Sequence, residues 1–193
     1  MRTLVLASTS PYRLQLLRQL GLSFQVAAPL FKETIDQEIA PELQVKHLSS
    51  HKAKSLAQRY PDALILGADQ VFVDGRGKVL GKPGSPEGAV AQLREMSGRS
   101  HTFFTGVTLL DSRSGVAMTD VVTFTVTLKK LSREQIQRYI DRENPVDCAG
   151  SFKIEGLGIA LMERMDGCDY TALIGLPLIK VTEMLGRFGV DVL

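Results

Sequence analysis

Short apolar segments of strand length alternate with helix-length segments at both ends of this chain, and two long β-rich stretches lie between them. The apolar runs 3–7 and 63–73 have the length of buried strands. The stretches 101–110 and 116–128 are joined by a turn and predict an antiparallel hairpin. Strand–helix alternation combined with a central hairpin predicts a mixed α/β sheet rather than a purely parallel, doubly wound one.

Three serine-based signals mark where helices begin. Ser10 and Ser85 each precede a proline, which is the N-cap and N1 pattern, and Ser132 with Gln135 has the spacing of a capping box. A proline at position 41 opens a further, longer segment, and glycines close several segments. The sequence therefore predicts helices over 11–20, 41–59, 86–96, 133–143 and 177–188, with strands also at 24–27 and 159–165.

Composition excludes several classes of protein. The chain has 193 residues, of which 44% are hydrophobic, which is enough for a sizeable core. Its 23 basic and 21 acidic residues give no general attraction to nucleic acid or to an anionic membrane, and no apolar run approaches the roughly 20 residues of a membrane span. Cys148 and Cys168 have no metal-site spacing. We expect a cytoplasmic protein that binds neither nucleic acid nor membrane.

The turn that follows the first strand has the features of an anion site. Ser8, Thr9 and Ser10 join the strand to a helix N-terminus, where free backbone N–H groups and the helix dipole favour a phosphate, and Arg13 lies one turn further on. An ordinary helix cap would have the same local sequence. No glycine-rich loop ending in Gly-Lys-Ser/Thr is present, so a Walker-type site is excluded.

Asp69 and Gln70 interrupt the apolar run 63–73. A carboxylate inside such a strand is costly unless it is paired, binds a metal or faces a cleft, so Asp69 is a candidate functional residue. Glu33 lies in a polar loop, and the two carboxylates could hold Mg²⁺. A capping or salt-bridged aspartate and a solvated surface glutamate remain the structural alternatives.

Two lysines and one glycine-rich segment complete the set of candidates. Lys52 lies in the long predicted helix, and Lys82 stands between Gly81 and Pro83, which restrict its direction. Either lysine alone reads more simply as a solvated side chain. The glycines between 150 and 158 would let a backbone approach a ligand closely, or form a mobile turn.

These signals occur in one order along the whole chain, and together they resemble the Maf family. The matching segments are Leu6-Ala7-Ser8-Thr9-Ser10-Pro11-x-Arg13, Glu33, Lys52, Asp69-Gln70, Gly81-Lys82-Pro83, Ser97-Gly98, Thr105-Gly106, Ala149-Gly150-Ser151-Phe152, Glu155-Gly156 and Gly175-Leu176-Pro177. The resemblance implies one Maf-like domain over 1–193 with a fold similar to inosine-triphosphate pyrophosphatases, a mixed α/β core with a cleft between two lobes. It also implies a hydrolase acting on acid anhydrides, which converts a nucleoside triphosphate to monophosphate and pyrophosphate with Mg²⁺ or Mn²⁺.

The resemblance assigns roles only to matching positions. Asp69 corresponds to the proton acceptor, and Glu33 with Asp69 to the metal-associated carboxylates. The triphosphate-binding set corresponds to Ser8, Arg13, Lys52 and Lys82. Two departures from the family pattern are Lys32, where an aspartate is frequent, and His47, where an arginine is common; neither replaces a residue with an assigned catalytic role.

Three residues resemble the Maf subgroup that favours 7-methyl-GTP, namely Tyr12, Gln70 and Glu155. Glu155 could accept the two N–H donors of guanine, and the ring of Tyr12 suits the cationic methylated base. Two alternatives for the function stay open: a pyrophosphatase for dTTP or UTP, and a non-enzymatic nucleotide-sensing regulator of cell division. For the assembly, a homodimer stays open beside a monomer.

Overall fold

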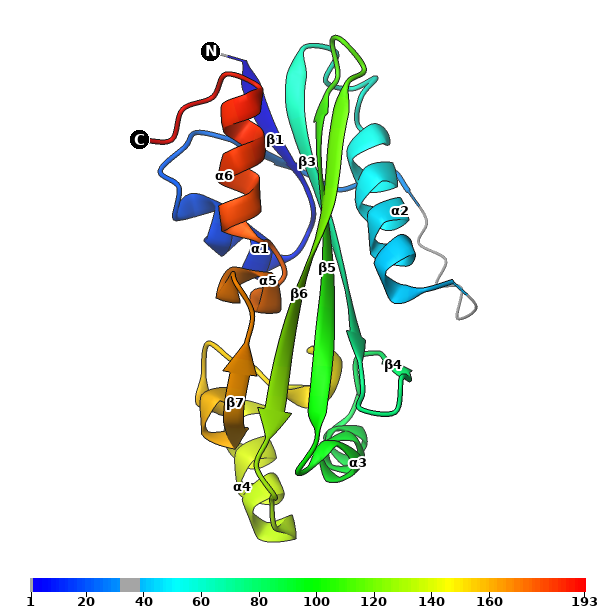
Figure 1. Cartoon of the computed structure of the whole chain (residues 1–193), viewed down its shortest axis with the longest axis vertical. Coiled ribbons are helices and arrows are strands. Elements are labelled where there is room, and N and C mark those ends of the chain that lie inside the picture. Colours follow the sequence, from blue (N-terminus) through cyan, green and yellow to red (C-terminus); the bar gives the residue numbers. More distant parts are fainter. Residues whose placement is uncertain (1, 32–38) are drawn as a thin grey trace. The chain divides into compact units, whose positions relative to one another are not determined.

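The computed structural model of this chain describes residues 2–31 and 39–193 (Figure 1). The strands among these residues are β1 (Thr3–Ala7), β2 (Gln25–Ala27), β3 (Ala63–Val73), β4 (Val79–Leu80), β5 (Ser100–Asp111), β6 (Ala117–Leu128) and β7 (Met162–Asp166). They form a seven-stranded sheet in the order β2-β1-β3-β5-β6-β7, with β4 paired to β3. β1 is parallel to β2 and β3, whereas β6 and β7 are antiparallel. The mixed α/β sheet expected from the sequence is confirmed.

Serine caps begin three of the helices, as predicted. The side chains of Ser10, Ser85 and Ser132 each accept a backbone N–H in the first turn, and Ser132 with Gln135 makes the full capping box. No helix among the described residues is long and apolar enough to cross a membrane. The helices are α1 (Pro11–Arg18), α2 (Pro41–Lys54), α3 (Pro86–Met96), α4 (Arg133–Glu143), α5 (Tyr170–Ile174) and α6 (Leu178–Arg187), with 3₁₀ turns η1 (Ala149–Ser151) and η2 (Leu157–Leu161).

The chain divides into two compact units. The first contains residues up to 70, 104–122 and 169–193, and the second contains 71–103 and 123–168. Because β3, β5 and β6 are long, each has residues in both units.

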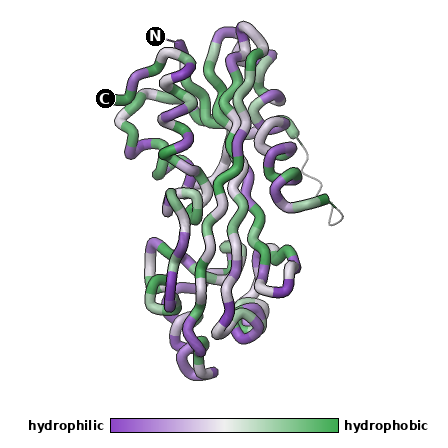
Figure 2. Tube along the Cα trace, in the orientation of Figure 1, coloured by the Kyte–Doolittle hydropathy of each residue, from purple (hydrophilic) through white to green (hydrophobic). Residues whose placement is uncertain are grey.

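In the first unit the side chains of β1 alternate between two hydrophobic layers. Leu4 and Leu6 pack with α1 and α6, whereas Val5 and Ala7 pack with Ala53 of α2. Figure 1 shows α1 and α6 on one side of β1 and β3 and α2 on the other, and Figure 2 shows much of these strands as hydrophobic. Successive strand residues point to opposite faces, so the continuous apolar run of β1 is explained by burial on both faces.

The second unit is built around a cluster of aromatic rings. Phe72 and Phe103 have ring centroids 4.5 Å apart, and Phe152 packs edge-on against Phe103 at 5.7 Å. Gly150 has φ of +78°, a conformation that favours glycine, and a Cβ there would crowd the Phe72 ring at 3.1 Å. The motif around residues 149–152 therefore has a packing role in this unit.

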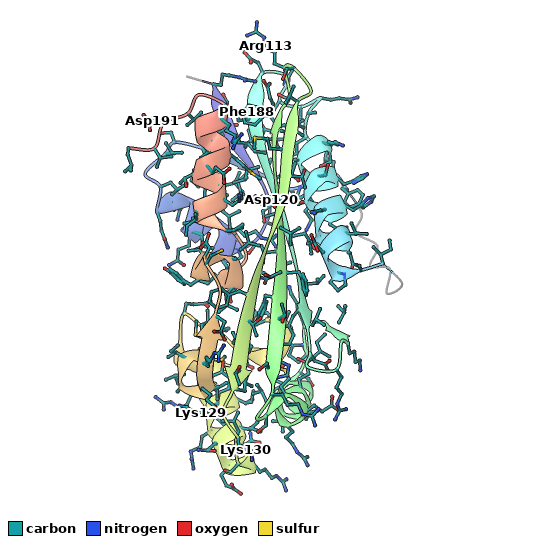
Figure 3. All side chains as sticks on the ribbon, viewed as in Figure 1. Arg113, Asp120, Lys129, Lys130, Phe188 and Asp191 are labelled. Atoms are coloured by element: carbon teal, nitrogen blue, oxygen red, sulfur yellow. The ribbon has the colours of Figure 1, made fainter. Side chains whose placement is uncertain are left out.

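β5 and β6 form the predicted antiparallel hairpin. Hydroxyl groups pair across it, Ser100 with Thr127 at 2.8 Å and Thr108 with Thr119 at 2.9 Å. As the residue numbers rise along β5, those of their partners fall along β6, which is the register of antiparallel strands. Figure 3 labels Arg113 in the connecting turn and Asp120 within β6.

The structure departs from the predicted segments at several places. α2 ends at Lys54 rather than near 59, where the Ser55 hydroxyl donates to the Lys52 carbonyl and accepts the N–H of Leu30. Such side-chain bonds compete with continuation of a helix. The predicted strand 159–165 begins only at 162, since residues 157–161 form η2, and the short α5 was not predicted at all.

Candidate active site

The turn between β1 and α1 lies at the carboxyl end of two parallel strands. Ala7 pairs with Gly67, so the chain leaves the sheet at Ser8, one position before Asp69 in the register of β3. Ser8 is buried, and its hydroxyl oxygen accepts the N–H of Ser10 at 3.1 Å. Ligands in α/β sheets bind at this edge. The sequence-predicted phosphate turn and Asp69 are thus brought to the same edge of the first unit.

The start of α1 carries the charge pattern expected of an anion site. The helix begins at Pro11 with no acidic residue in its first turn, and Tyr12 and Arg13 are both half-buried there. The backbone N–H groups of a first helical turn have no partners within the helix, and the helix dipole adds partial positive charge. This turn can therefore receive phosphate oxygens.

A buried ion pair joins α2 to β3. The Lys52 Nζ lies 2.5 Å from Asp69 Oδ1, and the side chains are only 6% and 9% exposed. Desolvating two charges is expensive, and the cost is recovered only by close pairing, so such a pair is weak evidence for a role in stability. A carboxylate and an ammonium group that are held together beside the carboxyl end of β1 are instead suited to bind charged groups and to exchange a proton.

Two glycines bring α2 close enough for this pair to form. A Cβ at Gly67 would lie 2.2 Å from the backbone oxygen of Ser49, and one at Gly106 would lie 2.3 Å from that of Val45. Neither backbone oxygen can move away as a side chain could. The helix therefore packs directly on the strand backbones, which explains the glycine two residues before Asp69 and the glycine of the Thr105-Gly106 motif.

Arg13 is anchored by the turn between α5 and α6. Its Nε donates to the Gly175 carbonyl at 2.9 Å. Gly175 has φ of +125°, a backbone conformation that favours glycine, and a Cβ there would lie 3.5 Å from Arg13 Nε and 3.9 Å from Gln70 Oε1. The Gly175-Leu176-Pro177 motif thus gathers two of the sequence-predicted site residues.

Gln70 ties β3 to α5. Its amide nitrogen lies 2.9 Å from Thr105 Oγ1, 2.7 Å from the Ala172 carbonyl and 3.2 Å from the Leu173 carbonyl. An amide nitrogen has only two hydrogens, so three acceptors share them. In the structure Gln70 connects elements of the first unit; its predicted role in substrate selectivity stays a prediction.

Asp169 and Thr171 hold this turn, and sequence reasoning missed both. The Asp169 carboxylate is buried and accepts the backbone N–H of Thr171 and of Ile179, each at 2.9 Å. The Thr171 hydroxyl in turn accepts the N–H of Leu178 at 2.8 Å. These bonds fix the starts of α5 and α6 and therefore the Gly175 carbonyl between them. The Asp-x-Thr spacing of an N-cap was the available signal.

The remaining predicted residues lie elsewhere. Lys82 is exposed in the segment after β4, where Gln92 donates to the Gly81 carbonyl, and Glu155 is exposed between η1 and η2; both belong to the second unit. Glu33 lies outside the described residues. The first unit therefore contains Ser8, Tyr12, Arg13, Lys52, Asp69 and Gln70. Within it the structure pairs Lys52 with Asp69 and places Arg13 and Gln70 at the Gly175 turn.

Comparison with known proteins decides the family. The profile of Maf, described as "Maf-like protein", matches residues 3–188. The chain belongs to the Maf family. A protein of Syntrophotalea carbinolica named 7-methyl-GTP pyrophosphatase is 65% identical over 193 residues, which cover 100% of this chain and 98% of that protein. Another so named, from Pseudomonas putida, is 50% identical over 193 residues, with all of both chains covered.

A solved structure supports the fold of this Maf protein independently of its sequence. The structure of a HAM1 protein from Coxiella burnetii covers 97% of this chain and 100% of its own, with a TM-score of 0.55 and 14% identity. At that identity the likeness concerns the fold alone. The expectation of a family fold shared with such proteins is confirmed.

Proposed function

We propose that this Maf protein hydrolyses 7-methyl-GTP to 7-methyl-GMP and pyrophosphate. The buried pair of Lys52 and Asp69 beside the Ser8 turn is the observation that carries the reaction type. The relatives named 7-methyl-GTP pyrophosphatase, identical at 47–65% over essentially the full chain, carry the choice of substrate. The cellular role that follows from this activity is the removal of a modified nucleotide.

Hydrolysis of the anhydride bond between the α- and β-phosphates needs charge stabilisation and a proton acceptor. Arg13 and Lys52 are cations at the same edge of the first unit as Asp69, and the first turn of α1 offers backbone donors. The Asp69 carboxylate can accept the proton of the attacking water while Lys52 holds its position. Lys82 is the fourth residue assigned to the triphosphate.

A divalent cation fits the donor chemistry of this site. Asp69 provides a carboxylate, the ligand that Mg²⁺ and Mn²⁺ prefer, and the substrate would provide phosphate oxygens. Glu33 is the second proposed ligand and lies outside the described residues. When bound, the cation would offset negative charge on the phosphates.

Base recognition is assigned to Tyr12, Gln70 and Glu155. Guanine presents N1–H and N2–H donors, which the Glu155 carboxylate can accept, and methylation at N7 gives the base a positive charge that an aromatic face attracts. Uracil and thymine offer a single N3–H donor between two carbonyl acceptors, so one carboxylate oxygen would be left facing a carbonyl without a donor. This chemistry favours 7-methyl-GTP over the pyrimidine nucleotides of the alternative subgroup.

Product analysis tests the proposal. The chelator-treated protein is incubated with 7-methyl-GTP, with or without added Mg²⁺ or Mn²⁺, and the products are separated. We expect 7-methyl-GMP and pyrophosphate in equal amounts, and only with the cation. Formation of 7-methyl-GDP and orthophosphate would contradict the cleavage position. Binding of the nucleotide without turnover would instead favour the nucleotide-sensing regulator.

A further inference from the structure

Glu155 is exposed at the middle of a tight turn, so few packing contacts are available to fix the direction of its side chain. The backbone fixes it instead. The N–H groups of Gly156 and Gly158 both donate to the Lys153 carbonyl, at 3.2 and 2.9 Å. These bonds close the turn around Glu155.

Two side chains of α4 hold this turn from outside. The Tyr139 hydroxyl oxygen accepts the N–H of Lys153 at 2.9 Å, and Glu143 Oε1 accepts the N–H of Leu157 at 3.0 Å. The two contacts therefore lie two residues before and two residues after Glu155. Tyr139 and Glu143 are four residues apart in the helix, so they project from the same face.

The contact with Glu143 is close along the whole turn. A Cβ added at Gly156 would lie 2.8 and 2.9 Å from the two Glu143 carboxylate oxygens. The Lys153 ammonium donates to the Glu143 backbone carbonyl at 3.3 Å and lies 3.7 Å from Asp147. A side chain at position 156 would therefore have to displace the Glu143 carboxylate that holds the turn.

Tyr139 is suited to a fixed structural bond. Its side chain is buried, and burial raises the pKa of its hydroxyl well above its usual value, so the hydroxyl stays neutral throughout the physiological range. The acceptor offered to Lys153 therefore does not change with pH.

We propose that Tyr139 and Glu143 are positioning residues that aim the Glu155 carboxylate and thereby set selectivity for the base. The inference rests on the proposed function, because it takes Glu155 as the group that recognises guanine. Neither side chain is required to touch the nucleotide. Loss of either contact lets one side of the turn move. The Glu155 side chain then adopts directions in which its carboxylate does not reach the base.

The test compares Glu143→Ala, Glu143→Gln and Tyr139→Phe with Glu155→Gln. The readouts are kcat and KM for 7-methyl-GTP and for UTP, and the exchange rates of the Lys153 and Leu157 amide hydrogens. Asp141→Ala is the matched control, because Asp141 is an exposed acid on the same helix and is bonded to Gln137.

We expect Glu143→Ala to lower the kcat/KM ratio of 7-methyl-GTP to UTP about tenfold, mainly through KM for 7-methyl-GTP, and to speed exchange at Leu157. Tyr139→Phe should have the same direction of effect, with faster exchange at Lys153. Glu143→Gln retains an oxygen that accepts from Leu157 and should keep most of the selectivity. Asp141→Ala should match the wild type.

Two results overturn different parts of the account. If Glu155→Gln reduces selectivity but Glu143→Ala and Tyr139→Phe lower only the melting temperature, the positioning inference is wrong and the proposed function stands. If Glu155→Gln leaves selectivity unchanged, recognition of guanine by Glu155 is wrong, and the positioning inference falls with it even where amide exchange is faster.

Discussion

At the scale of single residues, Asp69 carries the central chemical assignment. The sequence singled it out because a carboxylate inside an apolar strand needs a partner, and the structure supplies Lys52 at 2.5 Å. The partner itself could not be predicted, because nothing in the spacing of the two residues shows that α2 packs onto β3. That packing depends on Gly67, whose importance appears only in three dimensions.

Asp69→Asn should lower kcat by about 10²- to 10⁴-fold, because the amide keeps the shape of the side chain but cannot accept the proton of water. The melting temperature should also fall, since Lys52 loses its buried countercharge; breaking a buried ion pair costs about 3–5 kcal/mol when the remaining charge is left uncompensated. Steady-state kinetics and thermal unfolding measure the two effects. Near-normal turnover in the folded variant would exclude Asp69 as the base.

Arg13→Lys should behave more like Arg13→Ala than like the wild type. A lysine keeps the positive charge but has no Nε to donate to the Gly175 carbonyl, so its direction is lost. A charge-assisted hydrogen bond contributes about 1.5–3 kcal/mol, which predicts a roughly 10- to 100-fold lower kcat/KM for the triphosphate. Full activity of Arg13→Lys would show that charge alone suffices.

At the scale of elements, strong local signals were predictable and weak ones were not. Serine caps located the starts of α1, α3 and α4, because a cap is encoded within four residues. The five-residue α5 is too short to show helical periodicity, and the run 157–161 is apolar enough to resemble a strand although it forms η2. The motifs at 105–106 and 175–177 were visible in the sequence, but their roles required knowing which elements they join.

Gly67→Ala tests the packing of α2 on β3. The new methyl group would meet two backbone atoms, Ser49 O at 2.2 Å and Ala53 N at 2.8 Å, so the helix must shift. Overpacking of this kind costs about 1–3 kcal/mol, and displacement of Lys52 should also lower kcat. Gly186→Ala in α6 is the control, because a Cβ there has open space, and it should leave kcat unchanged. Equal behaviour of the two variants in urea unfolding and kinetics would refute this packing account.

His101 should make the second unit sensitive to acid. Its Nδ1 accepts the N–H of Gly75 at 3.1 Å and its Nε2 lies 2.8 Å from the Met96 carbonyl, so the neutral ring fits both contacts. Burial is the main cause that lowers the His101 pKa below its usual 6.5. The folded state therefore disfavours protonation relative to the unfolded chain. The stability due to the neutral ring is fully present above about 6.5 and is lost as pH falls through the lowered pKa.

Urea unfolding from pH 7 to pH 5 measures this effect. The free energy of unfolding should decrease more steeply in the wild type than in His101→Gln, which has no ring to protonate. Parallel curves for the two proteins would show that His101 does not titrate on unfolding in that range.

At the scale of the whole molecule, the Maf match over 3–188 spans both compact units. The first unit holds Ser8, Arg13, Lys52 and Asp69, while the second holds Lys82 and Glu155. Most residues assigned to the phosphates therefore belong to the first unit, whereas Glu155, which is assigned to the recognition of guanine, belongs to the second. The order of motifs made the family predictable from sequence, whereas the strand order of the sheet had to come from the structure.

The most direct test of the central claim is the ratio of kcat/KM values for pyrophosphate release from 7-methyl-GTP, GTP, dTTP and UTP by the wild-type protein. An unpaired polar group costs about 1–3 kcal/mol, so the account predicts a preference for 7-methyl-GTP over UTP and dTTP of roughly tenfold to a hundredfold. GTP should fall between them, because it has the guanine donors but lacks the fixed positive charge. A preference for dTTP or UTP would contradict the assigned substrate, and release of pyrophosphate from none of the four would contradict the pyrophosphatase itself.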